Sequence, residues 1–175
     1  IHAVWYKPRE PIGKRATPLT PPASVAYVLW LGPGADPPIF RNALHYDWHW
    51  DWNTGNGDMG NIGTHVIDVA RYFLGDPAPA RRVASFGNRF VWDDSGQTPN
   101  VHAAAFDFDV PVMLELNNLH LSPEGKRRMA YHKLGTGVVI SYEGGEFRGF
   151  GSGKVYDLDG KPMRSFKGSN IVPDH

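Results

Sequence analysis

The sequence predicts an α+β domain built on an open, mostly antiparallel β-sheet with helices packed on one face. Three observations favour this class. The clearest helical pattern lies early, strand-like runs separated by turn residues fill the later half, and no repeat or internal domain boundary is visible. A length of 175 residues suits one domain of ordinary size, so residues 1–175 are treated as a single domain.

Composition narrows the functional class. Eighteen basic and eighteen acidic residues give zero formal net charge, which argues against nucleic-acid binding and against a basic membrane-binding segment. The absence of cysteine excludes disulfide frameworks, cysteine-based metal sites and thiol nucleophiles. No apolar run approaches the roughly 18–20 residues that cross a bilayer. We therefore expect no nucleic acid and no membrane among the partners.

The first half of the chain is predicted to hold one strand, one long loop and two helices. Residues 1–7 are rich in β-branched and aromatic types and begin as a strand, whereas residues 8–24 carry five prolines and form a surface arm. Ser24 can cap a short helix over residues 25–31. The clearest helix runs over residues 61–74, where apolar side chains recur along a single stripe.

The second half is predicted to consist of strands. Its hydrophobic runs are separated by clusters of Asp, Gly, Ser and Pro, which is the turn chemistry that joins antiparallel strands. The predicted strands are residues 82–92, 101–109, 112–121, 129–134, 138–142 and 154–158.

A nine-residue segment concentrates three of the six tryptophans and two of the eight histidines. The segment consists of His45, Tyr46, Asp47, Trp48, His49, Trp50, Asp51, Trp52 and Asn53. Three interpretations stay open at this point. The indole faces and polar groups can bind a sugar ring, the two histidines and an aspartate can hold a metal if the segment is helical, or the alternate tryptophans can form the buried face of a strand.

The predicted helix over residues 61–74 carries a polar stripe beside its apolar one. Asn61, His65, Asp68 and Tyr72 recur at helical spacing and share one face. A histidine followed three residues later by a carboxylate suits general acid–base catalysis, with Asp68 fixing the imidazole tautomer. The alternative is a purely structural pair near a helix start, and both interpretations stay open.

Residues Gly55–Gly60 match the G-x-G-x-x-G pattern of dinucleotide-binding loops. Such a loop needs a buried apolar strand before it, whereas residues rich in His, Trp and Asp precede this one. Asp58 also places a negative charge where a pyrophosphate needs the positive end of a helix. We therefore predict a turn or close backbone approach at these glycines and no cofactor-binding residue in this domain. We also assign no residue of the domain as a metal ligand.

Several short motifs occur along the chain in an order typical of one family. They are Val4–Lys7, Ile12–Arg15, Leu29–Pro33, His45–Trp50, Gly57–Asp68, Phe90–Asp94 and Gly96–Pro99. On these motifs the chain resembles the C-terminal domain of bacterial-type Gfo/Idh/MocA oxidoreductases, which are NAD(P)-dependent. The resemblance covers nearly the whole chain and implies the open-sheet fold of the glyceraldehyde-3-phosphate-dehydrogenase-like C-terminal domain.

The resemblance also implies a role for the domain. In this family a Rossmann domain binds NAD or NADP and supplies the lysine of a Glu-Lys-Pro motif, and the second domain supplies the substrate pocket and often the oligomer interface. The sequence has no Glu-Lys-Pro. We therefore expect the substrate-binding and oligomerisation half of a sugar or polyol oxidoreductase, without the Rossmann domain or a further C-terminal helix. Such a half is inactive and binds no cofactor by itself.

The expected partners follow from that resemblance. They are a sugar or polyol, the missing Rossmann domain in cis or in trans, and further copies of the chain bound through the sheet face. The expected location is the cytoplasm, or the periplasm if a leader precedes the missing half. The alternative function is a non-catalytic carbohydrate-binding or assembly module derived from such a domain.

The resemblance assigns two catalytic positions. The family's pair is an Asp followed four residues later by a His, which correspond here to Asn61 and His65. By analogy, His65 accepts the proton of a substrate hydroxyl as hydride leaves for the nicotinamide. Asn61 cannot exchange a proton and is expected to position a hydroxyl. The residues expected to bind substrate around this pair are His45, Trp48, His49, Trp50 and Asp68.

Overall fold

The computed structural model describes residues 1–75, 77–119 and 131–168. Its helical elements are α1 (Tyr27–Leu31), the 3₁₀-helix η1 (Asp47–Trp50), the π-helical turn η2 (Met59–Gly63) and α2 (Thr64–Phe73). Its strands are β1 (His2–Tyr6), β2 (Val83–Asn88), β3 (Val101–Asp107), β4 (Pro111–Asn117), β5 (Thr136–Tyr142), β6 (Gly145–Phe150), β7 (Ser152–Tyr156) and β8 (Pro162–Phe166).

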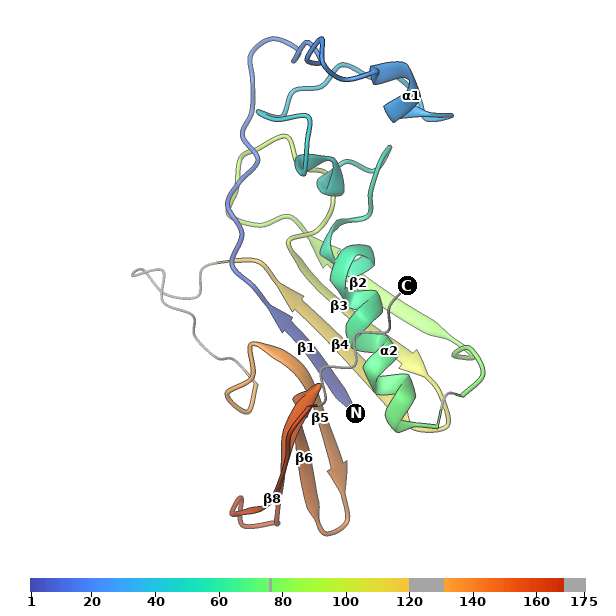
Figure 1. Cartoon of the computed structure of the whole chain (residues 1–175), viewed down its shortest axis with the longest axis vertical. Coiled ribbons are helices and arrows are strands. Elements are labelled where there is room, and N and C mark those ends of the chain that lie inside the picture. The colour runs from blue at the N-terminus through green and yellow to red at the C-terminus, as the bar shows by residue number, and fades with distance from the viewer. Residues whose placement is uncertain (76, 120–130, 169–175) are drawn as a thin grey trace.

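The strands of the described chain form one eight-stranded sheet in the spatial order β2-β3-β4-β1-β5-β6-β7-β8 (Figure 1). Neighbouring strands are antiparallel throughout, except that β1 runs parallel to β4 with Ala3 opposite Leu114. β1 therefore joins two antiparallel halves that are far apart in the sequence. The predicted α+β class with an open, mostly antiparallel sheet is confirmed.

The core lies between α2 and the middle of the sheet. α2 packs across β1, β4 and β5 on one face, as predicted from its apolar stripe (Figure 1). Val66 and Ala70, one turn apart, are completely buried against residues such as Leu114 and Val138. Each fully buried Val or Leu side chain contributes about 1.5–3 kcal/mol through removal of apolar surface from water. This packing fixes the start of α2 against the sheet.

The helical predictions need three corrections. The short helix begins at Tyr27, and Ser24 provides no side-chain cap. The longer helix opens with a π-helical turn at Met59 and becomes α-helical only from Thr64 to Phe73. The aromatic segment is a 3₁₀-helix, so its tryptophans do not alternate along a strand, and that interpretation is wrong. The local turn follows from hydrogen bonds within the segment rather than from hydrophobic spacing.

The strand predictions also need corrections. β2 ends at Asn88 rather than Trp92, because the chain leaves the sheet there to form a polar loop. The predicted strand at 129–134 reduces, in its described part, to one bridge between Tyr131 and Leu134, and residues 129–130 lie outside the described residues. β6 and β8 were not predicted. Glycines and charged residues interrupt the apolar pattern in β6, and Pro162, Arg164 and Ser165 interrupt it in β8.

An arm formed by residues 8–54 extends from the end of β1 and carries α1 and η1. In Figure 1 α1 lies at one end of the molecule, away from the sheet. None of the α1 residues is buried. No helix within the described residues is long and apolar enough to cross a membrane.

Candidate substrate site

A buried carboxylate, that of Asp58, lies where the arm, the sheet and α2 meet. The residue is only 2% exposed. The Arg9 guanidinium donates to it from Nε at 3.2 Å and from Nη2 at 3.1 Å. The side-chain amide of Asn118 donates at 2.7 Å and that of Asn61 at 3.2 Å. The Trp5 indole NH approaches at 3.4 Å, so five N–H groups surround one carboxylate.

These donors determine the ionisation of Asp58. Burial alone would raise the pKa of the carboxyl, but the hydrogen bonds and charge of Arg9, with the amides of Asn61 and Asn118, hold that pKa below its usual value. Asp58 is therefore ionised at neutral pH. A buried ion pair with further hydrogen bonds keeps its partners in a single arrangement, since losing either partner leaves an uncompensated charge.

The side chain of Asn61 is oriented by Asp58. An ionised carboxylate only accepts hydrogen bonds, so the group of Asn61 that faces it is the NH₂. The Asn61 carbonyl oxygen has no hydrogen-bond partner among the described residues and remains an acceptor for a ligand hydroxyl. Asn61 also lies within the π-helical turn, a local departure from α-helix that is frequent at functional sites.

His65 follows Asn61 at the start of α2 and is exposed to solvent. Within the described part of the chain, no hydrogen bond or ion pair joins it to Asp68. Asp68 is exposed too, and lines a cavity with Tyr72 and Phe73, further along the helix. Asn61 and His65 therefore lie where η2 passes into α2, whereas Asp68 lies one turn further along and lines a cavity that does not include them.

The aromatic segment is linked to Asp58 through Arg9. The Nη1 of Arg9 donates to the Tyr46 hydroxyl at 2.7 Å. The guanidinium also lies over the rings of Tyr46 and Trp50, 5.7 Å from each centroid. Trp50 is buried at this junction. Trp50 and Asn61, both expected at the substrate site, are thus connected by one arginine that the sequence patterns did not identify.

His49 is held in one tautomer. Its Nδ1 donates to the backbone carbonyl of Tyr46, which can only accept, so in the neutral ring Nε2 is an acceptor. The ring stacks on Trp48 with centroids 3.8 Å apart. His45 is exposed, and its imidazole makes no hydrogen bond or ring contact with the described residues. The described residues also contain no group of three or more metal-ligating side chains, so the metal interpretation lacks a ligand set there.

A hollow of about 460 Å³ opens between α1 and η1. Two indoles, Trp30 and Trp48, line it together with Pro33, Asn53 and Thr54. The Asn53 amide pairs with both backbone polar groups of Ala35, and this contact holds the two sides of the hollow together. Stacked aromatic faces beside polar groups suit a sugar ring.

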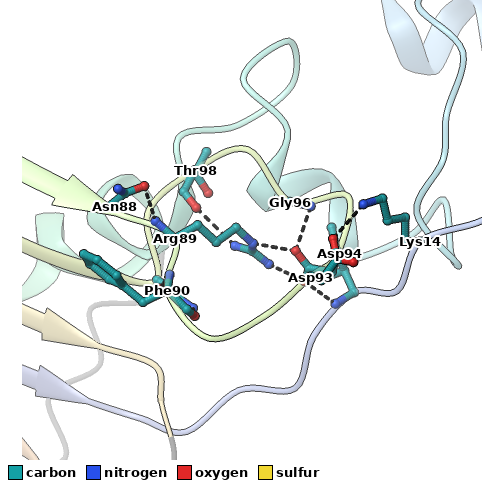
Figure 2. A network of polar contacts seen from close by, with 10 residues as sticks. Lys14, Asn88, Arg89, Phe90, Asp93, Asp94, Gly96 and Thr98 are labelled. Carbon is teal, nitrogen blue, oxygen red and sulfur yellow. Dashed lines mark hydrogen bonds and ion pairs between the residues drawn. The ribbon is translucent and has the colours of Figure 1, made fainter.

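A second buried ion pair, between Arg89 and Asp94, lies in the loop that follows β2 (Figure 2). Arg89 and Asp94 form two parallel hydrogen bonds of 2.6 Å, and both side chains are buried. The backbone N–H groups of Ile12 and Gly96 donate to the same carboxylate. Burial alone would raise the pKa of Asp94, yet Arg89 and these N–H groups lower it.

This network fixes the loop that follows β2. Arg89 also donates to the carbonyl of Thr98 at 3.1 Å, as Figure 2 shows. The backbone N–H groups of Gln97 and Thr98 then donate to the carbonyl of Trp50 at 2.8 and 3.3 Å. The Arg89–Asp94 pair therefore restrains this loop, and the loop in turn holds the aromatic segment at the backbone carbonyl of Trp50.

The glycines of Gly55–Gly60 make room for atoms of the chain itself. A Cβ on Gly55 would lie 2.7 Å from the backbone oxygen of His49, and one on Gly57 would lie 2.8 Å from Oγ1 of Thr98. A Cβ on Gly60 would overlap the side chain of Asn56. With Asp58 buried among donors, these residues do not fit a dinucleotide phosphate, and a cofactor of the family has no cradle at this motif.

Sequence patterns missed Arg9, Asp58, Asn118 and the Arg89–Asp94 pair as parts of this site. Arg9 lies in a proline-rich stretch typical of solvated loops, and Asp58 stands in a glycine-rich segment where its charge indicates only that phosphate binding is unfavourable. The available signal was a lone acid directly before a helix. Its partners are 49 and 60 residues away in the sequence, and no local pattern specifies such contacts.

Comparison with known proteins identifies the family. Residues 35–146 match the model of the GFO/IDH/MocA C-terminal domain. No curated protein and no solved structure matches the chain significantly. The matched region includes η1, η2, α2 and strands β2 to β5, and thus most of the site described above. The chain therefore belongs to the GFO/IDH/MocA oxidoreductase family, of which it carries the C-terminal domain.

Proposed function

We propose that this chain is the substrate-binding and oligomerisation half of an NAD(P)-dependent oxidoreductase acting on a sugar or polyol. The observation that carries the proposal is that Asn61 and His65 are four residues apart where η2 passes into α2. An oriented carbonyl acceptor and an exposed imidazole are four residues apart there, in a domain of an oxidoreductase family.

The two side chains divide the work on a substrate hydroxyl. The Asn61 carbonyl accepts a hydrogen bond and positions the alcohol, and Asp58 keeps that carbonyl in place. The exposed His65 imidazole takes the proton of the oxidised hydroxyl, a role that histidine often has in general acid–base catalysis. NAD or NADP, held by a separate Rossmann domain, supplies the redox chemistry. The cytoplasm suits such a cysteine-free domain.

The acid–base role is tested with the chain joined to or mixed with a Rossmann domain of the family. His65→Gln should lower kcat by roughly 10²-fold or more, the usual scale of general acid–base loss, and remove the limb of the pH–rate profile that reports the catalytic base. Thr64→Ala, at the neighbouring exposed position, is the matched control and should keep its rate. A near-normal kcat in His65→Gln would show that His65 is structural.

A non-catalytic carbohydrate-binding module is the second candidate function. The observation that favours it is the hollow between Trp30 and Trp48, which lies in the arm rather than at the start of α2. Calorimetry with a panel of sugars, with and without NAD, distinguishes the two. Sugar binding that is independent of NAD, lost in Trp48→Ala and kept in His65→Gln supports the binding module.

The oligomerisation part of the proposal concerns the sheet face turned away from α2. Ala3 packs under α2, so its neighbour Val4 points to the other face, where the register brings Glu115, Ala103 and Phe86 into the same row. Phe86 is exposed in this row and offers an apolar contact for a second copy.

A further inference from the structure

We propose that a basic cavity on the sheet face turned away from α2 binds an organic phosphate monoester. The cavity has a volume of about 520 Å³ and is lined by residues of the turn at 131–134 and of strands β5 to β7. It shares no residue with the candidate substrate site, and β6 lies at the end of the molecule opposite α1 (Figure 1). The proposal therefore does not depend on the proposed oxidoreductase function.

The alternation of side chains along the strands places two basic residues of the cavity on this face. Val138 packs under α2, so its neighbour Val139 points to the opposite face of the sheet. The register puts Arg148 of β6 opposite Val139, and Lys154 of β7 opposite Arg148. The oligomer contact proposed above lies on the other half of this face, on β1 to β4.

All the side chains in the lining that carry a full charge are basic. The basic residues are His132, Lys133, Arg148 and Lys154, and no acidic residue belongs to the lining that the structure describes. Arg148 and Lys154 are also direct cross-strand partners, and like charges in that arrangement destabilise a sheet. A bound anion would relieve this repulsion.

The chain itself neutralises only part of the positive charge. Arg148 donates from Nε to Oε1 of Glu146 at 2.6 Å, and the same oxygen lies 3.3 Å from Nδ1 of His132. The ammonium groups of Lys133 and Lys154 form no ion pair or hydrogen bond with any residue that the structure describes. Two positive charges are thus left. A phosphate monoester, with a charge of about −1.5 to −2 at pH 7, balances them, whereas a single carboxylate would balance only one.

The guanidinium group of Arg148 is held in place before a ligand arrives. In addition to its hydrogen bonds with Glu146, it lies over the ring of Tyr156, 4.2 Å from the centroid. Arginine has five N–H donors, so the donors that do not face Glu146 remain available to phosphate oxygens. A fixed donor lowers the cost of binding, because fewer rotamers are lost.

The turn that carries His132 and Lys133 has an unusual backbone for these residue types. The N–H of Leu134 donates to the carbonyl of Tyr131 at 2.8 Å, which closes a two-residue turn. His132 and Lys133 both have positive φ, 46° and 63°, and such turns favour Asn and Gly at these positions. Two basic residues are kept here at a conformational cost, and strain of this kind is typical of binding sites.

The cavity has room for more than a phosphate group. Its volume falls in the range of about 300–1,000 Å³ that is typical of sites for small organic ligands. Phe150, which is 40% exposed, supplies apolar surface, and Thr136 and Ser152 supply hydroxyl groups. The lining therefore suits an organic group attached to the phosphate, with Lys133, Arg148 and Lys154 binding the phosphate oxygens.

Amide NMR titration of the isotope-labelled chain tests the site. The probes are glucose 6-phosphate and adenosine monophosphate, and the comparison compounds are glucose, adenosine and inorganic phosphate. At least one ester should bind more tightly than all three comparison compounds and shift the amide signals of Gly149, Gly153 and Gly160, which line the cavity. If neither ester binds, or if inorganic phosphate binds as tightly as the esters, the proposal is wrong.

Two variants of exposed lysines identify the residues that bind phosphate. Lys154→Gln removes one ammonium group, and Lys133→Asn removes the other while suiting the left-handed backbone. Each should raise the Kd of the ester about 10-fold or more, the scale of a lost hydrogen bond between charged groups. Lys161→Gln is the matched control, because this exposed lysine follows Gly160 but does not line the cavity.

Three results of the variant experiments would overturn the proposal. Unchanged affinity in both lining variants would place the ester elsewhere. An equal loss in Lys161→Gln would show only a general effect of net charge. If neither ester binds and Lys154→Gln weakens self-association in analytical ultracentrifugation, the basic cavity belongs to a contact between copies of the chain.

Discussion

At the scale of single residues, Asp58 joins three parts of the chain that are distant in sequence. It receives Trp5 and Arg9 from the end of β1 and the start of the arm, Asn61 from the π-helical turn, and Asn118 from beyond β4. The same carboxylate therefore stabilises the fold and orients a side chain of the site. This double use explains why an ionised group is retained where an apolar one would pack without a desolvation cost.

Replacing Asp58 should lower the stability of the protein much more than replacing an exposed acidic residue. Asp58→Ala leaves the Arg9 charge buried without its partner and should lower the free energy of unfolding by about 3–5 kcal/mol in urea titrations. Asp93→Ala is the control, because Asp93 forms an exposed ion pair with Lys14 at 2.6 Å. That change should cost less than about 1 kcal/mol. Equal losses in the two variants would mean that the buried pair contributes nothing special.

The residues of the site were only partly predictable. Asn61 and His65 follow from family resemblance, and Trp50 from its local aromatic context. Arg9 and Asn118, which hold Asp58 beside Asn61, are distant in the sequence and carry no local pattern. Asp68 shares a helical face with His65 in the sequence, yet it lines a cavity whose walls do not include His65. Helical spacing specifies a shared face, whereas the packing of neighbouring strands decides which hollow each turn of that face borders.

At the scale of elements, the aromatic helix η1 depends on a close backbone approach at Gly55. The Thr54 hydroxyl donates to the carbonyl of Trp48 at 2.9 Å, and the N–H of Gly55 donates to the carbonyl of Asp51 at 2.7 Å. The chain thus folds tightly back on η1 immediately after it. Only a residue without a side chain fits here without displacing backbone atoms.

Gly55→Ala should therefore destabilise the protein and disturb η1. The added Cβ would lie within 3.0 Å of three backbone atoms of Trp48 and His49, none of which is the end of a flexible side chain. The expected loss is about 1–3 kcal/mol, as for overpacking in a closed space. Gly144→Ala, with open space around its Cβ, should be neutral or slightly stabilising. Thermal unfolding of both variants checks this, and a stable Gly55→Ala protein would contradict it.

Elements with a recognisable apolar pattern or with clear turn residues at their ends could be predicted, whereas β6, β8 and η1 could not. α2 and β4 each bury one face, so their sequences show the corresponding period, whereas β1 and β5 bury consecutive residues and are recognisable as short apolar runs. β8 buries none of its residues, and η1 is organised by hydrogen bonds and ring contacts. Such elements leave no period to detect.

At the scale of the whole molecule, stability is concentrated around β1. This strand pairs with β4 on one side and β5 on the other, and α2 covers all three. The arm leaves from the end of β1 and is fixed mainly at its base, by the Arg9–Asp58 pair and by the contact of Ile12 with Asp94. The tip of the arm lacks comparable buried contacts, so local opening there costs far less than global unfolding.

Hydrogen exchange should reveal this gradient. Amides of β1, β4 and β5 should exchange slowest, and those of α1 should exchange fast in dilute protein, since one turn with no buried side chain opens easily. Measurement by mass spectrometry over minutes to hours covers the relevant opening events. Strong protection of α1 at every concentration would instead require a cover from within the same chain.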